Sequence, residues 1–133
     1  MALRVNDGAA PETSERYTQS RKRSRIVKYL CLAYGDGKDW EALSGAEQAE
    51  LLANDEKLRR RGDFVAALDP TGTVVRAWDG TPTRSAIPFA ESRQPLVGFS
   101  IIEAGSIDDV VELVAGTPCA RAKGAIEIRP LMK

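Results

Sequence analysis

The chain has 133 residues, of which 43% are hydrophobic, and its 19 Lys and Arg residues balance 19 Asp and Glu residues. This composition is typical of one globular domain; no apolar run approaches the roughly 18 to 20 residues that cross a bilayer, and the N-terminus lacks a secretory signal, so we expect a cytoplasmic protein. The sequence contains no histidine, which excludes Ser/His/Asp and Cys/His catalytic sets and the HExxH zinc motif.

Residues 1–25 differ in character from the rest of the chain. They carry six basic and three acidic side chains, with Tyr17 as their single aromatic residue and no apolar periodicity. Such a segment buries too little surface to offset its ordering entropy, so we predict a disordered extension. Its basic cluster at residues 21–25 could contact nucleic acid, although a solvated tail is the more common meaning of such a run. A natural translation start near Val27 would also account for this segment.

A regular pattern begins with residues 26–34, IVKYLCLAY, which predict a strand with two apolar faces. Both faces of such a strand must be covered. After a polar turn at residues 35–39, Ser44 and Glu47 form a capping box. The box predicts a helix that runs to about residue 61 and ends at the following glycine.

A short second strand and a hairpin are predicted next. Residues 64–68, FVAAL, form the strand. Residues 73–78 and 81–85 flank Asp79-Gly80, the dipeptide favoured by type I′ hairpins. We therefore expect a hairpin between the two halves of the domain.

The second half of the domain repeats the order of the first. Residues 96–104, LVGFSIIEA, predict a strong strand, and Ser106 caps a helix with apolar residues at helical spacing over residues 107–114. Residues 125–129, AIEIR, predict the last strand. The order βαβ-hairpin-βαβ indicates an α+β fold of the ferredoxin-like type, with a domain over residues 26–133.

The predicted sheet needs a partner. Two helices can cover one face of a single sheet, which leaves an apolar face exposed. The economical solution is a two-fold homodimer in which sheet packs on sheet. The alternative is a monomer whose residues 69–95 fold over that face, but this segment has few apolar residues, which favours the dimer.

The two cysteines and the glycine-rich turns do not indicate a cofactor. Cys31 and Cys119 are 88 positions apart, a spacing without metal-ligand character, and reduced, mostly buried thiols are the simplest interpretation. A catalytic thiolate would need Lys, Arg or a helix N-terminus to lower its pKa. No phosphate-binding loop, calcium loop or CxxC pair is present, so we expect no cofactor and no metal.

Four segments together resemble a known family. They are KYLCLAYGD at residues 28–36, the helix start at residues 42–44, IPFAESRQ at residues 87–94 and AIEIRPLM at residues 125–132. In this order and spacing they resemble the YCII-related, or DGPF, family of small bacterial proteins. The resemblance covers about residues 27–132 and implies a ferredoxin-like, dimeric α+β barrel with a pocket in each protomer.

The chain departs from the signature of that family. The family usually reads DGPFAETKE, whereas Ala86 and Ile87 replace the Asp and Gly here and Gln94 replaces the last Glu. Relatives in the wider YCII group carry a His/Asp pair proposed for acid–base chemistry in dehalogenation or lactone-type reactions. Because this chain has no histidine, that chemistry cannot be carried over.

Six residues are candidates for lining a pocket: Tyr34, Asp36, Asp63, Phe89, Glu91 and Arg93. Glu91 and Arg93 lie two apart on one side of an extended segment, where they could hold a small acidic ligand or form an exposed ion pair worth under about 1 kcal/mol. Tyr34 and Asp36 lie at the exit of the first strand and Asp63 at the entry of the second, although turn chemistry explains both aspartates. Phe89 and Trp78 are expected in the core or a pocket wall, because no basic face accompanies them.

Two functions remain open at this point. The first is a homodimeric domain that binds a small molecule or a protein partner without histidine-based catalysis. The second is a cofactor-free lyase or isomerase with Asp63 or Glu91 as base and Arg93 steadying an anionic substrate. A buried carboxylate with a raised pKa inside a pocket would favour the enzyme.

Overall fold

The computed structural model describes residues 26–132; the predicted extension at residues 1–25, with its basic cluster, and residue 133 lie outside this range. The elements in chain order are β1 (Val27–Tyr34), α2 (Gly37–Glu41), α3 (Gly45–Arg61), β2 (Phe64–Ala67), β3 (Val74–Arg76), β4 (Thr83–Ser85), β5 (Leu96–Ala104), α4 (Ile107–Val114), α5 (Pro118–Arg121) and β6 (Ala125–Pro130). None of the helices in residues 26–132 is long and apolar enough to cross a membrane.

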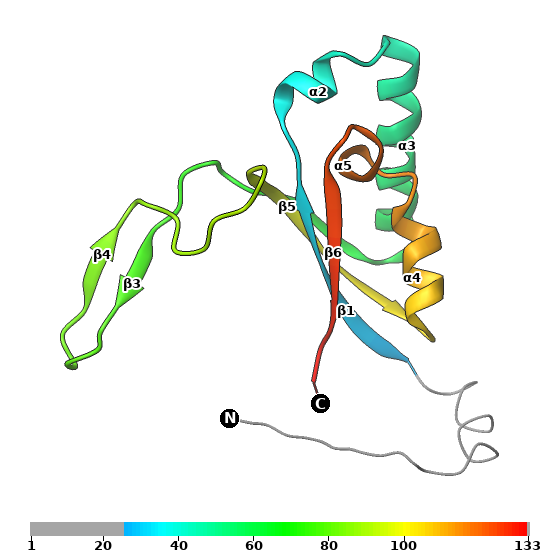
Figure 1. The fold of residues 1–133 in the computed structure, drawn as a ribbon. Coiled ribbons are helices and arrows are strands. Elements are labelled where there is room, and N and C mark those ends of the chain that lie inside the picture. The colour runs from blue at the N-terminus through cyan, green and yellow to red at the C-terminus, as the bar shows by residue number, and fades with distance from the viewer. Residues whose placement is uncertain (1–25, 133) are drawn as a thin grey trace.

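The main sheet has the order β2-β5-β1-β6. Strand β1 pairs antiparallel with β5 and with β6, and β2 pairs antiparallel with β5. The helices α3, α4 and α5 lie on one side of this sheet (Figure 1). This is the predicted ferredoxin-like α+β arrangement, with β3 and β4 inserted between its two halves.

The core lies between the sheet and the helices. Tyr29 and Cys31 of β1 are buried on this side of the sheet, and Ile102 of β5 and Val110 of α4 are fully buried. Alternation and the strand register place Tyr29, Cys31 and Ile102 on the same face of the sheet, against which Val110 packs. We call this covered side the helix face.

The opposite side of the sheet is apolar and uncovered within one chain, as predicted. We call it the open face, and alternation assigns to it Leu30, Leu32, Tyr34, Phe64, Ala66, Phe99 and Ile101. All of these side chains are half-buried or exposed. The rings of Phe64 and Phe99 lie 5.5 Å apart between centroids, so the two neighbouring strands present one continuous aromatic surface.

Helix α3 begins and ends where its residues predict. The Ser44 hydroxyl accepts from the Glu47 amide at 3.1 Å, and the Glu47 carboxylate accepts from the Ser44 amide at 2.9 Å. Gly62 ends the helix with φ +101°, a left-handed conformation that glycine adopts without the steric cost of a Cβ.

Two short helices were not expected. The predicted turn at residues 35–39 runs into α2, because the Asp36 carboxylate accepts from the Lys38 amide at 2.9 Å and caps the helix. The second, α5, begins at Pro118. Proline suits this position because the first helical amide needs no partner.

The predicted hairpin is present, but its turn is longer than a type I′ turn. Val74 pairs with Ser85 and Arg76 pairs with Thr83, which leaves residues 77–82 as the loop. The Gly80 amide donates to the Ala77 carbonyl at 3.0 Å, so Asp79-Gly80 ends a turn instead of forming its centre. Pro82 lacks an amide hydrogen and cannot extend the ladder.

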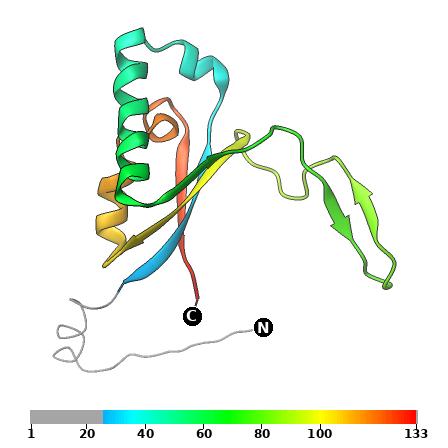
Figure 2. The same ribbon diagram turned by 180° about the vertical axis from the view of Figure 1, so that it is seen from behind.

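Residues 69–95, which we call the arm, leave the rest of the domain, which we call the body. The arm extends away from the sheet on the side opposite the helices (Figures 1 and 2). The alternative in which this segment folds over the open face of its own chain is therefore wrong.

Candidate functional site

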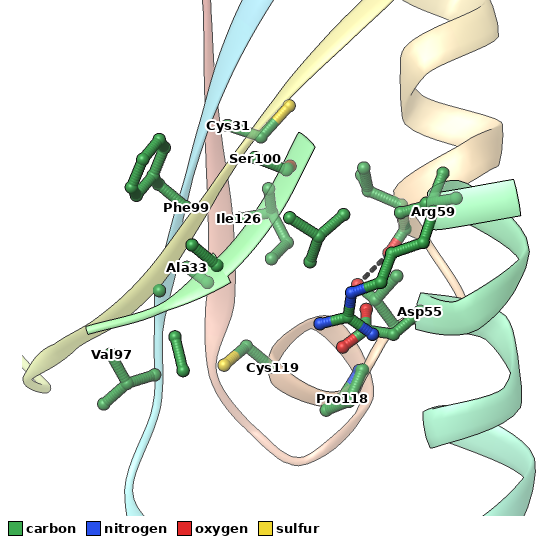
Figure 3. A pocket seen from close by; sticks show the side chains of 17 residues that line it. Cys31, Ala33, Asp55, Arg59, Val97, Phe99, Ser100, Pro118, Cys119 and Ile126 are labelled. Carbon is green, nitrogen blue, oxygen red and sulfur yellow. Dashed lines mark hydrogen bonds between the residues drawn. The ribbon is translucent and has the colours of Figure 1, made fainter. Parts of the chain in front are cut away.

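A pocket of about 200 Å³ lies between the helix face of the sheet and the helices α3 and α5. We call it the inner pocket (Figure 3). Its apolar lining includes Ala33, Leu58, Val65, Val114 and Ile126, and its polar lining consists of Cys31, Asp55, Arg59, Ser100, Thr117 and Cys119. A mostly apolar pocket with a few convergent polar groups is the usual form of a small-molecule site.

Helix α3 supplies the charged groups of the inner pocket. Asp55 and Arg59 lie one turn apart on this helix, so they face the same side and point into the pocket (Figure 3). Next to them, the Asn54 side-chain amide donates to the Gly116 carbonyl at 2.8 Å. This bond holds α3 against the segment before α5, and it fixes the distance between the two helical walls.

The Asp55 carboxyl is the chemically distinctive group of this pocket. Within residues 26–132 it forms no hydrogen bond or ion pair, because the Arg59 guanidinium contacts Glu56 at 3.5 Å instead. Burial raises the pKa of the Asp55 carboxyl, and the nearby charge of Arg59 partly offsets this. A carboxyl without a partner is therefore available to a ligand.

Sequence reasoning missed Asp55. Helix α3 has no single apolar stripe, so its periodicity did not show which polar residues turn toward the sheet. The wall opposite Asp55 is α5, a helix that was not expected. The signal therefore lay in a contact between distant segments, which a linear pattern does not contain.

The two cysteines are free thiols, and Cys31 is buried. Burial raises the pKa of Cys31, and it raises the pKa of Cys119, to which the negative charge of Asp55 adds. Both groups are therefore thiols at neutral pH, which agrees with the prediction and disfavours a thiolate nucleophile. No three Cys, Asp or Glu side chains in the described part of the chain gather as metal ligands.

Three of the six predicted site residues meet in a second, wider cavity. Tyr34, Glu91 and Arg93 line an open cleft of about 630 Å³ together with Lys123 and Glu127. We call it the outer cleft. The ion pairs of residues 26–132 do not include Glu91 with Arg93, so the expected exposed pair is absent. Both side chains are exposed.

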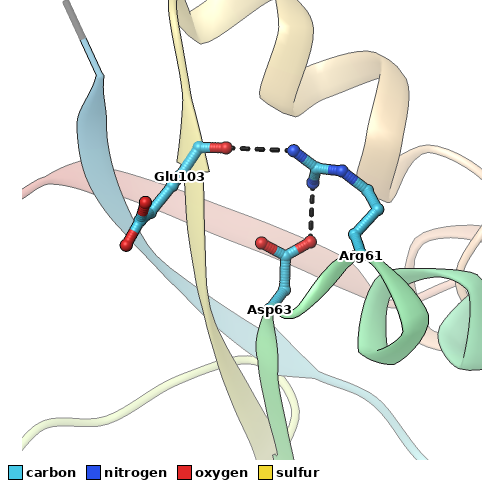
Figure 4. Close-up of polar contacts among 3 residues, drawn as sticks. All are labelled: Arg61, Asp63 and Glu103. Atoms are coloured by element: carbon cyan, nitrogen blue, oxygen red, sulfur yellow. Dashed lines mark hydrogen bonds and ion pairs between the residues drawn. The ribbon is translucent and has the colours of Figure 1, made fainter.

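The two predicted aspartates have structural roles. Asp36 caps α2, as described above. Asp63 accepts from the Arg61 guanidinium at 2.6 Å, and Arg61 also donates to the Glu103 carbonyl at 3.0 Å (Figure 4). The Asp63 side chain is 6% exposed. Its position is level with Tyr29 by the strand register, about five strand residues, or roughly 16 Å, from Tyr34.

The aromatic residues of the arm are not where they were expected. Phe89 and Trp78 were predicted in the core or a pocket wall, but they are 71% and 86% exposed. The prediction is wrong because the arm leaves the body. The guanidinium carbon of Arg76 lies 5.7 Å from the Trp78 ring and 5.2 Å from the Phe89 ring, so one cation contacts both.

The fold and the inner pocket define an α+β, ferredoxin-like domain with a cavity between its sheet and its helices. The family model of the YCII-related domain matches residues 27–133, and the chain therefore belongs to this family. An uncharacterized protein of Rhizobium meliloti (strain 1021) is 25% identical over 112 residues, which cover 77% of this chain and 90% of that protein. The resemblance to the YCII-related family found in the sequence is confirmed.

Proposed function

We propose that this YCII-related domain binds a small molecule in the inner pocket without histidine-based catalysis, and that it does so as a homodimer. The observation that carries the proposal is the Asp55 carboxyl, which faces an apolar pocket and has no partner among the described residues. A partly buried carboxyl that lines a mostly apolar pocket and has no partner within the described chain is a polar anchor for a ligand.

The size and chemistry of the inner pocket restrict the ligand. Its volume of about 200 Å³ is comparable with the roughly 150 Å³ apolar cavity that takes up benzene in another protein. The aliphatic walls favour a compact apolar part. At the polar end, the Arg59 guanidinium is a donor-only group that suits an acceptor on the ligand. The ligand therefore carries an acceptor oxygen, as a small carboxylic acid or a lactone does.

Thermal-shift measurements with small acids and lactones test this proposal. A ligand at about one hundred times its Kd stabilises the folded state by roughly 2.7 kcal/mol. Ala33→Leu fills the inner pocket and should abolish the shift. Ala53→Leu makes the same change on the exposed surface of α3 and should preserve it. Equal shifts in both variants would place the ligand elsewhere and contradict the proposal.

The open face supports the homodimer. Apolar side chains from three neighbouring strands form one patch there, and a patch of this kind marks an association surface. Light scattering should report twice the 14.4 kDa mass of the chain. Leu32→Glu, in the middle of the open face, should give monomers, whereas Leu52→Glu on the exposed surface of α3 should not. A monomer at all concentrations would contradict the dimer.

A second candidate function is a cofactor-free lyase or isomerase, and Asp55 is the observation that favours it. A carboxyl in a pocket whose pKa is raised by burial is a candidate for a general acid or base. Asp55 is a better candidate for this role than Asp63, which Arg61 holds, or Glu91, which is exposed. Asp55→Asn should abolish turnover of a bound compound. If the unsubstituted protein binds the compound without turning it over, the enzyme function is contradicted and the binding function remains.

A further inference from the structure

The arm has no core of its own. None of residues 69–95 is buried. The hydrogen bonds between arm and body lie at the end of the arm, where the Pro95 carbonyl accepts from the Gly35 amide at 3.0 Å and the Gln94 side-chain amide donates to the Asp39 carboxylate at 3.4 Å. A two-stranded hairpin is at best marginally stable in water by itself. A hairpin of this shape therefore needs a surface to pack against.

The exposed side chains of the arm are suited to such packing. Val75, Trp78, Ile87 and Phe89 are 61%, 86%, 75% and 71% exposed. Arg76 contacts both aromatic rings, which limits their freedom before any association. Tryptophan and arginine are also the residue types that most often carry binding energy in protein interfaces.

The direction of the arm indicates where its partner lies. The helices occupy one side of the sheet and the arm extends on the other, the side of the open face (Figures 1 and 2). Any molecule that covers the open face therefore lies next to the arm. The arm and the open face of the sheet therefore lie on the same side of the domain (Figures 1 and 2).

The charges favour a second copy of the chain over a charged partner. The arm carries three acidic side chains, Asp69, Asp79 and Glu91, and three basic ones, Arg76, Arg84 and Arg93. At the edges of the open face, Lys28 pairs with Glu103 and Arg129 with Glu127 within the chain. Neither surface has the one-sided charge that attracts nucleic acid or an anionic membrane. Two apolar surfaces with balanced charge can meet their own copies across a two-fold axis without like-charge repulsion.

We propose that each arm packs across the body of a second copy of this chain, so that two exchanged arms hold the sheet-to-sheet dimer together. The inference rests on the homodimer proposed above and adds the element that secures it. The arm side chains at the contact are Trp78, Phe89 and Ile87. In this arrangement the arm is ordered by the partner copy and not by its own body.

Tryptophan fluorescence tests the inference directly. The chain has two tryptophans, and Trp40→Phe leaves Trp78 as the single reporter. At a concentration where light scattering reports a dimer, Trp78 should be shielded from acrylamide, and dilution to monomer should expose it. An exposed Trp78 in a dimer would overturn the arm contact while leaving the dimer intact. A shielded Trp78 in a monomer would also overturn it, since the arm would then pack on its own body.

Truncation of the arm side chains gives a second measurement. Trp78→Ala combined with Phe89→Ala should raise the Kd of the dimer by about tenfold or more. Leu52→Ala, which shortens an apolar side chain on α3 that is also exposed, is the matched control and should leave this Kd unchanged. An unchanged Kd in the arm variant would contradict the inference. A monomer at every concentration, before any substitution, would instead remove the homodimer on which it rests.

Discussion

The body and the arm both contain large apolar residues, but those of the body are buried and those of the arm are exposed within one chain. The body buries Tyr29, Cys31 and Ile102 between a sheet and its helices, whereas Trp78 and Phe89 of the arm face solvent within one chain. Both regions contain strands with alternating side chains. The difference is that the body strands have helices above them and the arm strands have nothing. The apolar character of a residue therefore indicates that it is to be buried. It does not indicate whether its own chain or another molecule buries it.

The largest expected effect comes from the core of the body. Ile102→Ala should lower the free energy of unfolding by about 2–5 kcal/mol, because it leaves a cavity among fully buried side chains. Val75→Ala shortens an exposed strand residue of the arm. In diluted protein it should change the free energy of unfolding by less than about 0.5 kcal/mol. Chemical denaturation measures both. If Val75→Ala lowered the free energy of unfolding as much as Ile102→Ala, the arm and the body would unfold as one unit.

Two glycines with the same backbone conformation sharpen the comparison. Gly62 ends α3 with φ +101°, and Gly80 lies in the loop of the arm with φ +92°. Gly62→Ala should cost about 1–2 kcal/mol, because a Cβ is disfavoured in this conformation. Gly80→Ala has the same local cost but should leave the thermal unfolding of the body unchanged. Equal losses of Tm would contradict the separation of the two regions.

The smallest expected effect concerns Asp55. Burial raises its pKa in the folded state above the ordinary value of 3.8, so the folded protein binds this proton more tightly than the unfolded chain. Its charge therefore costs stability as pH rises through the interval between the two pKa values. Asp55→Asn should stabilise the protein at pH 7 by less than about 1 kcal/mol, since the residue is only partly buried and solvent screens its charge.

The measurement for Asp55 is unfolding at two pH values. At pH 3 the carboxyl is protonated in both states, so the advantage of Asp55→Asn over the unsubstituted protein should disappear. Glu50→Gln, on the exposed surface of the same helix, is the matched control and should show no such difference. A stabilisation that persists at pH 3 would mean that the amide gains a new contact and that the charge is not the cause.

Local patterns predicted most of the body. The two apolar faces of β1, the capping box of α3 and the helical spacing in α4 are each contained in a few neighbouring residues. The open face was predictable too, because it follows from the number of helices. The resemblance to the family located the segment with Glu91 and Arg93, and the structure brings these residues next to Tyr34.

The inner pocket and the arm could not be predicted in this way. Asp55 faces a wall formed by α5, more than sixty positions later in the sequence, and only the tertiary fold brings them together. Trp78 and Phe89 have the composition of core residues. Their position depends on the direction in which the hairpin leaves the sheet, which the dipeptide Asp79-Gly80 does not encode.

The point where the arm joins the body affects how the length and sequence of the arm can change in evolution. The two ends of the arm meet at neighbouring strands, where Leu68 bonds to Val97, so insertions within it need not disturb the sheet. Doubling the length of such a loop adds only about 0.6 kcal/mol of closure entropy. Duplicated genes could therefore acquire arms of different length and sequence at little cost. If the arm packs on a second copy, as proposed above, such changes would alter which chains can pair.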